Sequence, residues 1–237
     1  MFEAEAMGLA EIAATATIAV PRPLCRGSNR DAAWLVLEHI EFGEARAGSM
    51  AQLGEALARL HRVTAGKFGW TRDNAIGTTS QINTQGRDWV AFWRDRRLGY
   101  QLALAARNGA PTALIEKGER LKQACDALLG GAAITPALLH GDLWGGNAGF
   151  DRAGAPVIFD PAVYYGHREA DLAMTELFGG FSANFYAAYR NAYPLDGGYE
   201  VRKRLYNLYH VLNHFNLFGG GYARQAQTLI DGLLAEF

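Results

Sequence analysis

Apolar residues recur at helical spacing at the start of the chain, where Phe2 and Leu9 share one face between acidic residues. This pattern predicts a helix over the first residues. A short apolar run at residues 34–37 predicts a buried strand, and residues 38–48 are interpreted as a connector. The chain is therefore expected to open with one helix followed by a small amount of sheet.

Helical periodicity dominates the next part of the chain. Leu53 and Leu57 belong to an apolar stripe that predicts a helix ending near His61. Residues 68–87 contain several Gly and Asn and little periodicity, so we expect a structured loop there. Asp88 stands just before a long aromatic-rich run and is a candidate N-cap for the helix that follows.

Two short strands and a series of helices are predicted for the rest of the chain. The strands are residues 137–139 and 157–159, the second following a turn at residues 151–154. Further helices are expected near residues 113–129, 172–178, 184–193, 200–217 and 223–237. Few early strands and many later helices predict an α+β protein with a small sheet lobe and a large helical lobe.

Composition is that of an ordinary globular protein. Of the 237 residues, 49% are apolar and 20% are charged, and the formal net charge is −1. This balance gives no reason to expect nucleic acid or an acidic membrane surface as a partner. No signal peptide precedes the first helix, and no apolar run approaches the roughly 18–20 residues of a membrane span. Only Cys25 and Cys125 are present, which favours a reducing, cytoplasmic location.

The candidate chemistry lies in residues 140–147, HGDLWGGN, and in an acidic residue at the end of the later apolar run. Phosphoryl transfer from ATP requires a carboxylate that accepts the proton of the attacking hydroxyl and oxygen ligands that hold magnesium on the phosphates. We therefore predict Asp142 as the catalytic base. Asn147 and Asp160 are the predicted Mg²⁺ ligands.

The order of these residues resembles the catalytic loop of the protein-kinase-like fold, with His-Gly-Asp in place of His-Arg-Asp. Longer segments resemble the fructosamine kinase (ketosamine-3-kinase) family, which is related to aminoglycoside and choline kinases. They include residues 88–98 (DWVAFWRDRRL), 159–181 (FDPAVYYGHREADLAMTELFGGF) and 208–214 (LYHVLNH). The resemblance implies ATP- and Mg²⁺-dependent phosphorylation of the sugar 3-hydroxyl of ketosamines, small or protein-bound, which removes glycation.

Two other functions remain open. One is phosphorylation of another amine-bearing small molecule, such as an aminoglycoside or choline, although the segment at residues 159–169 argues against it. The other is a noncatalytic kinase-like remnant that binds nucleotide weakly or serves as a partner for another protein.

The resemblance also implies a nucleotide site. Glu5 matches the helix glutamate that pairs with a strand lysine in the family, and this lysine also binds phosphate. Glu38, His39 and Ile40 resemble the hinge between the lobes, where adenine pairs with backbone groups. We therefore expect these four residues on the ATP side of the cleft.

On the substrate side, Trp144 lies inside the catalytic loop, where its ring is a candidate to stack on the sugar or on its amine-bearing substituent. Arg168 and Glu169 follow an aromatic turn and are candidate substrate contacts. Asp171, slightly later, is expected to brace the catalytic loop, and His140 is expected to hold the loop through hydrogen bonds.

The glycine-rich loop and strand lysine of the family have no counterpart before Glu5, since the first basic residue is Arg22. We expect residues 1–40 to be a partial N-terminal β lobe and residues 41–237 to be the C-terminal lobe. Roughly the first 35–50 residues of a family member, which carry that loop and lysine, are missing. A start assigned too late, a truncated gene and a remnant are the open explanations.

Such a chain is expected to bind ATP weakly and to be a poor kinase. Phe2, Leu9 and residues 34–37 would then be more exposed than in a complete lobe. An exposed apolar edge invites association. We therefore expect self-association through this surface.

Overall fold

The computed structural model describes residues 1–131 and 134–237. The helices are α1 (Phe2–Ala14), α2 (Ser49–Leu60), α3 (Trp89–Phe92), α4 (Gly99–Arg107), α5 (Thr112–Gln123), α6 (Cys125–Leu129), α7 (Glu169–Leu177), α8 (Ala183–Ala192), α9 (Tyr199–Phe218) and α10 (Tyr222–Leu234), with a π-helical turn η1 (Trp93–Leu98) and a 3₁₀ turn η2 (Gly145–Asn147). The strands are β1 (Pro23–Ser28), β2 (Ala33–Leu37), β3 (Phe42–Gly43), β4 (Asn74–Ile76), β5 (Thr79–Gln81), β6 (Ala137–Leu139), β7 (Ala148–Asp151), β8 (Pro156–Ile158) and β9 (Tyr164–Gly166).

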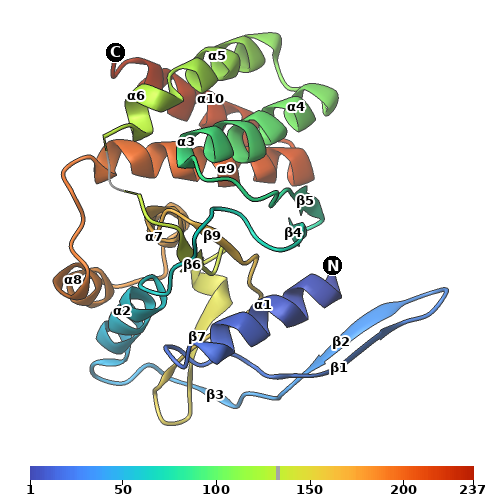
Figure 1. Cartoon of the computed structure of the whole chain (residues 1–237), viewed down its shortest axis with the longest axis vertical. Helices are drawn as coiled ribbons and strands as arrows, with labels where there is room; N and C mark the ends of the chain where they lie inside the picture. Colours follow the sequence, from blue (N-terminus) through green and yellow to red (C-terminus); the bar gives the residue numbers. More distant parts are fainter. Residues whose placement is uncertain (132–133) are drawn as a thin grey trace.

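Helices and strands separate in space as the α+β prediction requires. Figure 1 shows α3, α4, α5, α6 and α10 gathered around α9, with α1 and the hairpin of β1 and β2 at the opposite end of the molecule. Helix α9 is the centre of the helical part, and residues such as Leu205, Tyr206 and Leu212 on it are fully buried. No helix in the described part of the chain is long and apolar enough to cross a membrane.

The first helix forms as predicted, but it is better buried than expected. Leu9 is fully buried, so the expectation that it would be exposed is wrong. The reason is that α1 packs on the segment after Asp160, where the Cα of Gly8 lies so close that an added Cβ would sit 3.0 Å from Val163 Cγ2. The carboxylate of Glu11 on α1 also accepts a hydrogen bond from the Tyr165 hydroxyl at 2.8 Å.

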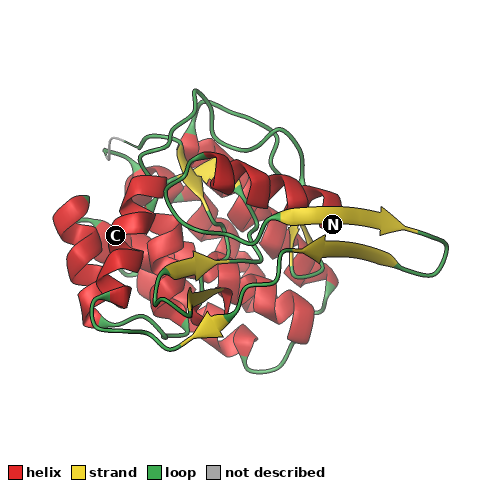
Figure 2. Ribbon diagram, turned by 90° about the horizontal axis from the view of Figure 1, so that it is seen from below, coloured by secondary structure: helices red, strands yellow, loops and turns green. Residues whose placement is uncertain are grey.

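Residues 34–37 form a strand as predicted, within β2, but the strand is not buried. It pairs only with β1, in an antiparallel hairpin that projects from the molecule (Figure 2). Trp34 and Val36 are each 42% exposed, and Leu24 on β1 is 55% exposed. Helix α1 contacts both strands of this hairpin. Leu35 and Leu37 are half-buried, while the alternate residues Trp34 and Val36 stay in contact with solvent. Self-association through this surface stays a prediction.

The segment at residues 68–87 contains a hairpin that sequence reasoning missed. Strands β4 and β5 pair in antiparallel register, with Ile76 opposite Thr79 across a two-residue turn.

Asp88 caps the next helix as predicted, because its carboxylate accepts hydrogen bonds from the Val90 and Ala91 amides.

Two small sheets carry the catalytic loop. Strand β6 pairs with β9, and β7 pairs with both β3 and β8, the latter across the predicted turn at residues 151–154. The loop between β6 and β7 therefore enters from one sheet and leaves into the other.

The two cysteines are both free thiols. Cys25 is exposed and Cys125 is buried. The cytoplasmic location stays a prediction.

Candidate active site

The catalytic loop is shaped by a glycine. Gly141 has a φ of +84°, a left-handed conformation that a side chain disfavours. A Cβ at this position would lie 2.1 Å from the carbonyl oxygen of Ala162. The Ala162 amide in turn donates to the His140 carbonyl at 2.8 Å. The loop and the segment after Asp160 can therefore lie against each other only because residue 141 has no side chain.

Asp171 on α7 holds the start of the loop, as predicted. Its carboxylate accepts hydrogen bonds from the amides of His140 and Gly141, at 2.7 and 2.8 Å, and from the ring of His61 at 3.2 Å. Burial alone would raise the pKa of Asp171, but the hydrogen bond from His61 and the donated amides keep the pKa below its usual value. His61 is itself fixed by the Tyr189 hydroxyl at 2.8 Å.

His140 is a fully buried part of this support, as expected. Its Nε2 donates to the carbonyl of Phe159 at 3.0 Å, and its Nδ1 accepts from the Asp142 amide at 3.3 Å. Burial lowers the pKa of His140, so the ring is neutral. The imidazole thus links the loop residue Asp142 to the strand that leads to Asp160.

The structure brings Asp142, Asn147 and Asp160 together. The side-chain amide nitrogen of Asn147 donates to the Asp142 carbonyl at 2.9 Å and approaches the Asp142 carboxylate and the Asp160 carbonyl, each at 3.5 Å. Asp160 has a left-handed φ of 56°. Two carboxylates and an amide oxygen are hard oxygen donors of the kind that Mg²⁺ prefers. No cluster of three or more His, Cys, Asp or Glu suited to a metal occurs among the described residues.

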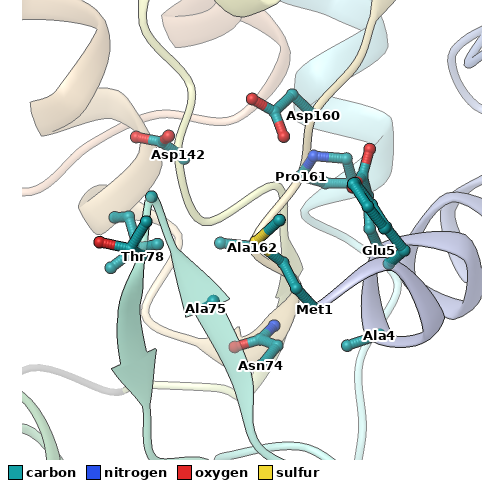
Figure 3. A pocket seen from close by; sticks show the side chains of 13 residues that line it. Met1, Ala4, Glu5, Asn74, Ala75, Thr78, Asp142, Asp160, Pro161 and Ala162 are labelled. Atoms are coloured by element: carbon teal, nitrogen blue, oxygen red, sulfur yellow. The ribbon is translucent and has the colours of Figure 1, made fainter. Parts of the chain in front are cut away.

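These groups line a cavity of about 380 Å³, here named the acidic cavity (Figure 3). Its walls come from α1, the β4–β5 hairpin, the catalytic loop and the segment after β8. Glu5 lines it from α1, and its role in a nucleotide site stays a prediction. None of the ion pairs within the described part of the chain includes Glu5, which lines the cavity together with Met1. The charge of the N-terminal amine opposes the rise in the pKa of Glu5.

Two carboxyl groups of the acidic cavity, Asp142 and Glu5, have raised pKa values. Burial raises the pKa of Asp142 to about 7, the charges of Asp160 and Asp171 act in the same direction, and the hydrogen bond from Asn147 opposes them. Burial and the charge of Asp160 also raise the pKa of Glu5. A cation placed among these groups would relieve the repulsion, which is the electrostatic property expected of a metal-phosphate site.

A second cavity, also of about 380 Å³, adjoins the first and is here named the aromatic cavity. Asp142, Ile76 and Gly77 line both cavities. The aromatic side chains that line the second one are Trp144, Phe178, His214, Phe218 and Tyr222. Trp144 lines this second cavity, and its place on the substrate side stays a prediction.

His214 contacts three of the other rings that line the aromatic cavity. Its ring lies 4.9 Å from that of Phe178, 5.7 Å from that of Phe218 and 5.1 Å from that of Tyr222, measured between centroids. Sequence reasoning missed these residues. The signal that was present is the spacing of His214 and Phe218, one helical turn apart at the end of α9.

The structure does not bring Arg168 and Glu169 to either cavity. Arg168 donates to the Tyr189 hydroxyl and the Tyr193 carbonyl, each at 3.1 Å, and its guanidinium lies 3.8 Å from the centroid of the Tyr193 ring. Glu169 is buried and forms a bidentate ion pair with Arg202, at 2.7 and 2.8 Å. Their charged groups are occupied locally, so the expected substrate contacts are not found.

Glu38, His39 and Ile40 lie in the connection from β2 to β3, and none of them lines the two cavities. Glu38 pairs with Arg22 through its amide, which donates to the Arg22 carbonyl at 2.8 Å, and through its carboxylate, which accepts from the Arg22 amide at 3.3 Å. The adenine contacts at these three residues stay a prediction.

The fold and site define a kinase of the protein-kinase-like fold. Aminoglycoside phosphotransferase APH(4)-Ia shares the fold with a TM-score of 0.64, at 15% sequence identity over 99% of this chain and 81% of that chain. A putative fructosamine-3-kinase from Haemophilus somnus is closer, with a TM-score of 0.91 and 32% identity over 99% of this chain and 79% of that chain.

The chain belongs to the fructosamine kinase family, whose sequence profile matches residues 1–236. A probable ketoamine kinase of Synechocystis is 52% identical over 99% of this chain and 79% of its own length. A chloroplastic protein-ribulosamine 3-kinase of Arabidopsis thaliana is 46% identical over 99% of this chain and 72% of its own length.

Proposed function

We propose that this chain transfers the terminal phosphoryl group of ATP to the sugar 3-hydroxyl of ketosamines, with Mg²⁺ as the metal. The observation that carries the proposal is the position of Asp142, which lines both the acidic and the aromatic cavity. A base at the boundary of two cavities suits a reaction that joins two substrates. The names of the Synechocystis and Arabidopsis relatives supply the substrate class.

In this reaction Asp142 accepts the proton of the attacking hydroxyl. Its raised pKa, about 7, matches the value at which a general base is most effective near neutral pH. Asn147 and Asp160 would hold Mg²⁺, which supplies neutralisation of the charge on the phosphate oxygens. The residues of the chain thus position the hydroxyl and the phosphates, which is the main contribution of the protein in phosphoryl transfer.

The aromatic cavity is proposed to bind the ketosamine. Sugar rings present apolar C–H faces that pack on aromatic side chains, and the cationic amine of a ketosamine is attracted to an aromatic face. Trp144 is the proposed stacking residue, and the rings around His214 form another part of the wall of the cavity. A substrate linked to a lysine of another protein is included in the proposal.

The test is incubation of the chain with γ-labelled ATP, Mg²⁺ and ribulosyl-lysine or fructosyl-lysine, with the labelled position determined by NMR. We expect phosphate on the 3-hydroxyl, and the sensitive label makes slow turnover measurable. Labelling of choline or an aminoglycoside in preference to ketosamines would favour the small-molecule alternative. Nucleotide binding without transfer to any of these would favour the noncatalytic remnant.

Replacement of Asp142 by Asn tests its role. We expect turnover of the ketosamine to fall by about 10²–10⁴-fold, since positioned proton transfer contributes that much. ATP affinity is expected to change little. Asp126→Asn is the matched control, because Asp126 is exposed on α6 and lies outside both cavities. Near-normal turnover in the Asp142 variant would contradict the assignment.

A further inference from the structure

The tip of the β4–β5 hairpin stands where the two cavities meet. Ile76 and Gly77 line both cavities, and Thr78 lines the acidic cavity. Figure 3 shows Thr78 at the end of the hairpin, on the same side of the cavity as Asp142. A group that passes from one cavity to the other therefore passes the backbone of Gly77 and the side chain of Thr78.

The tip is held in place from the side of α9. Gly77 has a φ of +59° in the two-residue turn, and a Cβ there would lie 3.0 Å from Leu217 Cδ1. The side-chain amide of Asn213, also on α9, approaches the Ile76 carbonyl at 3.4 Å. The turn thus rests against the helix that supplies part of the aromatic cavity.

The stem of the hairpin is tied to the other side of the site by two side-chain amides. Asn74 donates to the Val163 carbonyl at 2.8 Å, and Gln81 donates to the Ala162 carbonyl at 3.0 Å. Gln81 also accepts from the buried Tyr209 hydroxyl at 2.8 Å. Because Ala162 and Val163 follow Asp160 closely, these bonds fix the distance between the hairpin tip and the predicted metal ligand.

The tip carries donors that are not used within the protein. In residues 1–131 and 134–237, neither the Thr78 hydroxyl nor the amides of Gly77 and Thr78 have a hydrogen-bond partner. Lys and Arg are absent from the residues that line the acidic cavity, where three carboxylates face inward. A phosphoryl group bound next to Asp142 would share the cavity with these neutral donors, and such donors stabilise developing negative charge.

We propose that the hairpin tip at Gly77 and Thr78 binds the phosphoryl group during its transfer, which rests on the proposed function in taking ATP as the phosphate donor. The bond from the terminal phosphorus to the bridging oxygen of ADP breaks, and ADP leaves with the electron pair. A bond forms to the sugar oxygen, whose proton passes to Asp142. The tip forms no covalent bond, and its hydroxyl and amides donate to the phosphoryl oxygens.

Thr78→Val removes the hydroxyl with little change of shape, and Thr78→Ser retains it. Thr78 is exposed, so both variants should fold, which a melting curve verifies. Ser80→Ala is the matched control, because Ser80 is exposed on β5 of the same hairpin and lines neither cavity. Calorimetry measures the affinities for ATP and ADP in the presence of Mg²⁺, and steady-state kinetics give kcat and KM for a ketosamine.

We expect Thr78→Val to lower kcat by about 10²-fold or more, as the loss of one donor to developing charge does. The preference for ATP over ADP should fall several-fold, while the KM for the ketosamine is unchanged. Thr78→Ser should restore both quantities, and Ser80→Ala should alter neither.

Three results would overturn the inference: an unchanged preference for ATP over ADP in Thr78→Val, an effect on the ketosamine KM alone, or no preference for ATP in the unaltered chain. The second result would assign the tip to the sugar instead of the phosphoryl group. If ketosamines are not phosphorylated but Thr78→Val still reduces the preference for ATP, the proposed substrate is wrong and the inference about the tip stands.

Discussion

Gly141 shows how much of the site depends on a single residue. Its left-handed backbone and missing side chain allow the Ala162 carbonyl to approach, and this contact sets the loop of Asp142 against the segment of Asp160. The Asp171 carboxylate also holds Gly141 in place by accepting a hydrogen bond from its backbone amide. The relative position of the two carboxylates is therefore determined by backbone geometry more than by their own side-chain contacts.

Replacement of Gly141 by Ala is expected to destabilise the chain and to disable the site. The left-handed backbone costs about 1–2 kcal/mol for a residue with a Cβ, and the clash with Ala162 adds to it. Gly109→Ala is the control, because Gly109 also has a positive φ, +80°, but an added Cβ meets no atom within 4 Å. Urea denaturation should show the larger loss for residue 141, and equal losses would refute the role of the Ala162 contact.

For single residues, the sequence predicted those positions in the site that depend on short spacing along the chain. Asp142, Asn147 and Asp160 lie close together because the loop and the following hairpin are short, so their order along the chain was informative. The sequence did not show that Arg168 and Glu169 lie outside both cavities, because the partners that hold them are distant in sequence. Glu169 pairs with Arg202 on α9, and no local pattern indicates that a charged residue will be buried with such a partner.

Among the elements, the β4–β5 hairpin is supported by an unusual buried cation. Arg97 is fully buried on the π-helical turn η1, and no ion pair in the described part of the chain includes it. Its guanidinium lies 4.1 Å from the centroid of the Tyr164 ring and donates to the Asn83 side chain at 2.7 Å and to the Ile82 carbonyl at 2.6 Å. Aromatic faces and neutral acceptors take the place of a counter-ion.

Arg97→Met is expected to lower the free energy of unfolding by roughly 2–4 kcal/mol, because the buried acceptors on Asn83 and Ile82 lose their donor. Asn83 also donates to Asn74 on β4, at 2.8 Å, so hydrogen exchange of the β4 and β5 amides should accelerate. Arg96→Met is the control, since Arg96 is the exposed neighbour. Unchanged exchange in the hairpin would show that Arg97 does not support it.

The β4–β5 hairpin and the projecting β1–β2 pair show which features of an element cannot be predicted from the periodicity of apolar residues. Strands of three residues, such as β4 and β5, are too short to show alternation, and only the glycine at the turn indicated them. In β2 the apolar run predicted a strand correctly, but an apolar run does not reveal which other element covers it. The long helices, whose periodic stripes span several turns, were predicted to within a few residues.

Over the whole molecule, buried neutral histidines make stability depend on pH. Burial lowers the pKa of His167 and of His210, each to about 3. The unfolded chain takes up protons on these rings as the pH falls below about 6.5, while the folded chain does not. Unfolding therefore becomes easier on acidification, and each ring contributes up to about 1.4 kcal/mol per pH unit between about 6.5 and about 3.

His210→Phe tests this dependence, because the Nδ1 of His210 has no hydrogen-bond partner among the described residues and the ring is buried. Urea denaturation at pH 7.5, 6 and 5, chosen to bracket the histidine range, should give a shallower loss of stability than in the unaltered chain. His39→Gln, at an exposed position, is the control and should leave the slope as it is. Parallel slopes for His210→Phe and the unaltered chain would be inconsistent with this explanation.

Asp142 belongs to the wall of both cavities, and a shared wall makes their occupancies interdependent. A nucleotide and its metal in the acidic cavity change the charge around this carboxylate. They therefore also change the electrostatic environment of a sugar in the aromatic cavity. Thermodynamic linkage then requires reciprocity: the factor by which nucleotide alters the affinity for sugar is the factor by which sugar alters the affinity for nucleotide. The affinity of either ligand is thus a property of the ternary complex and not of one cavity.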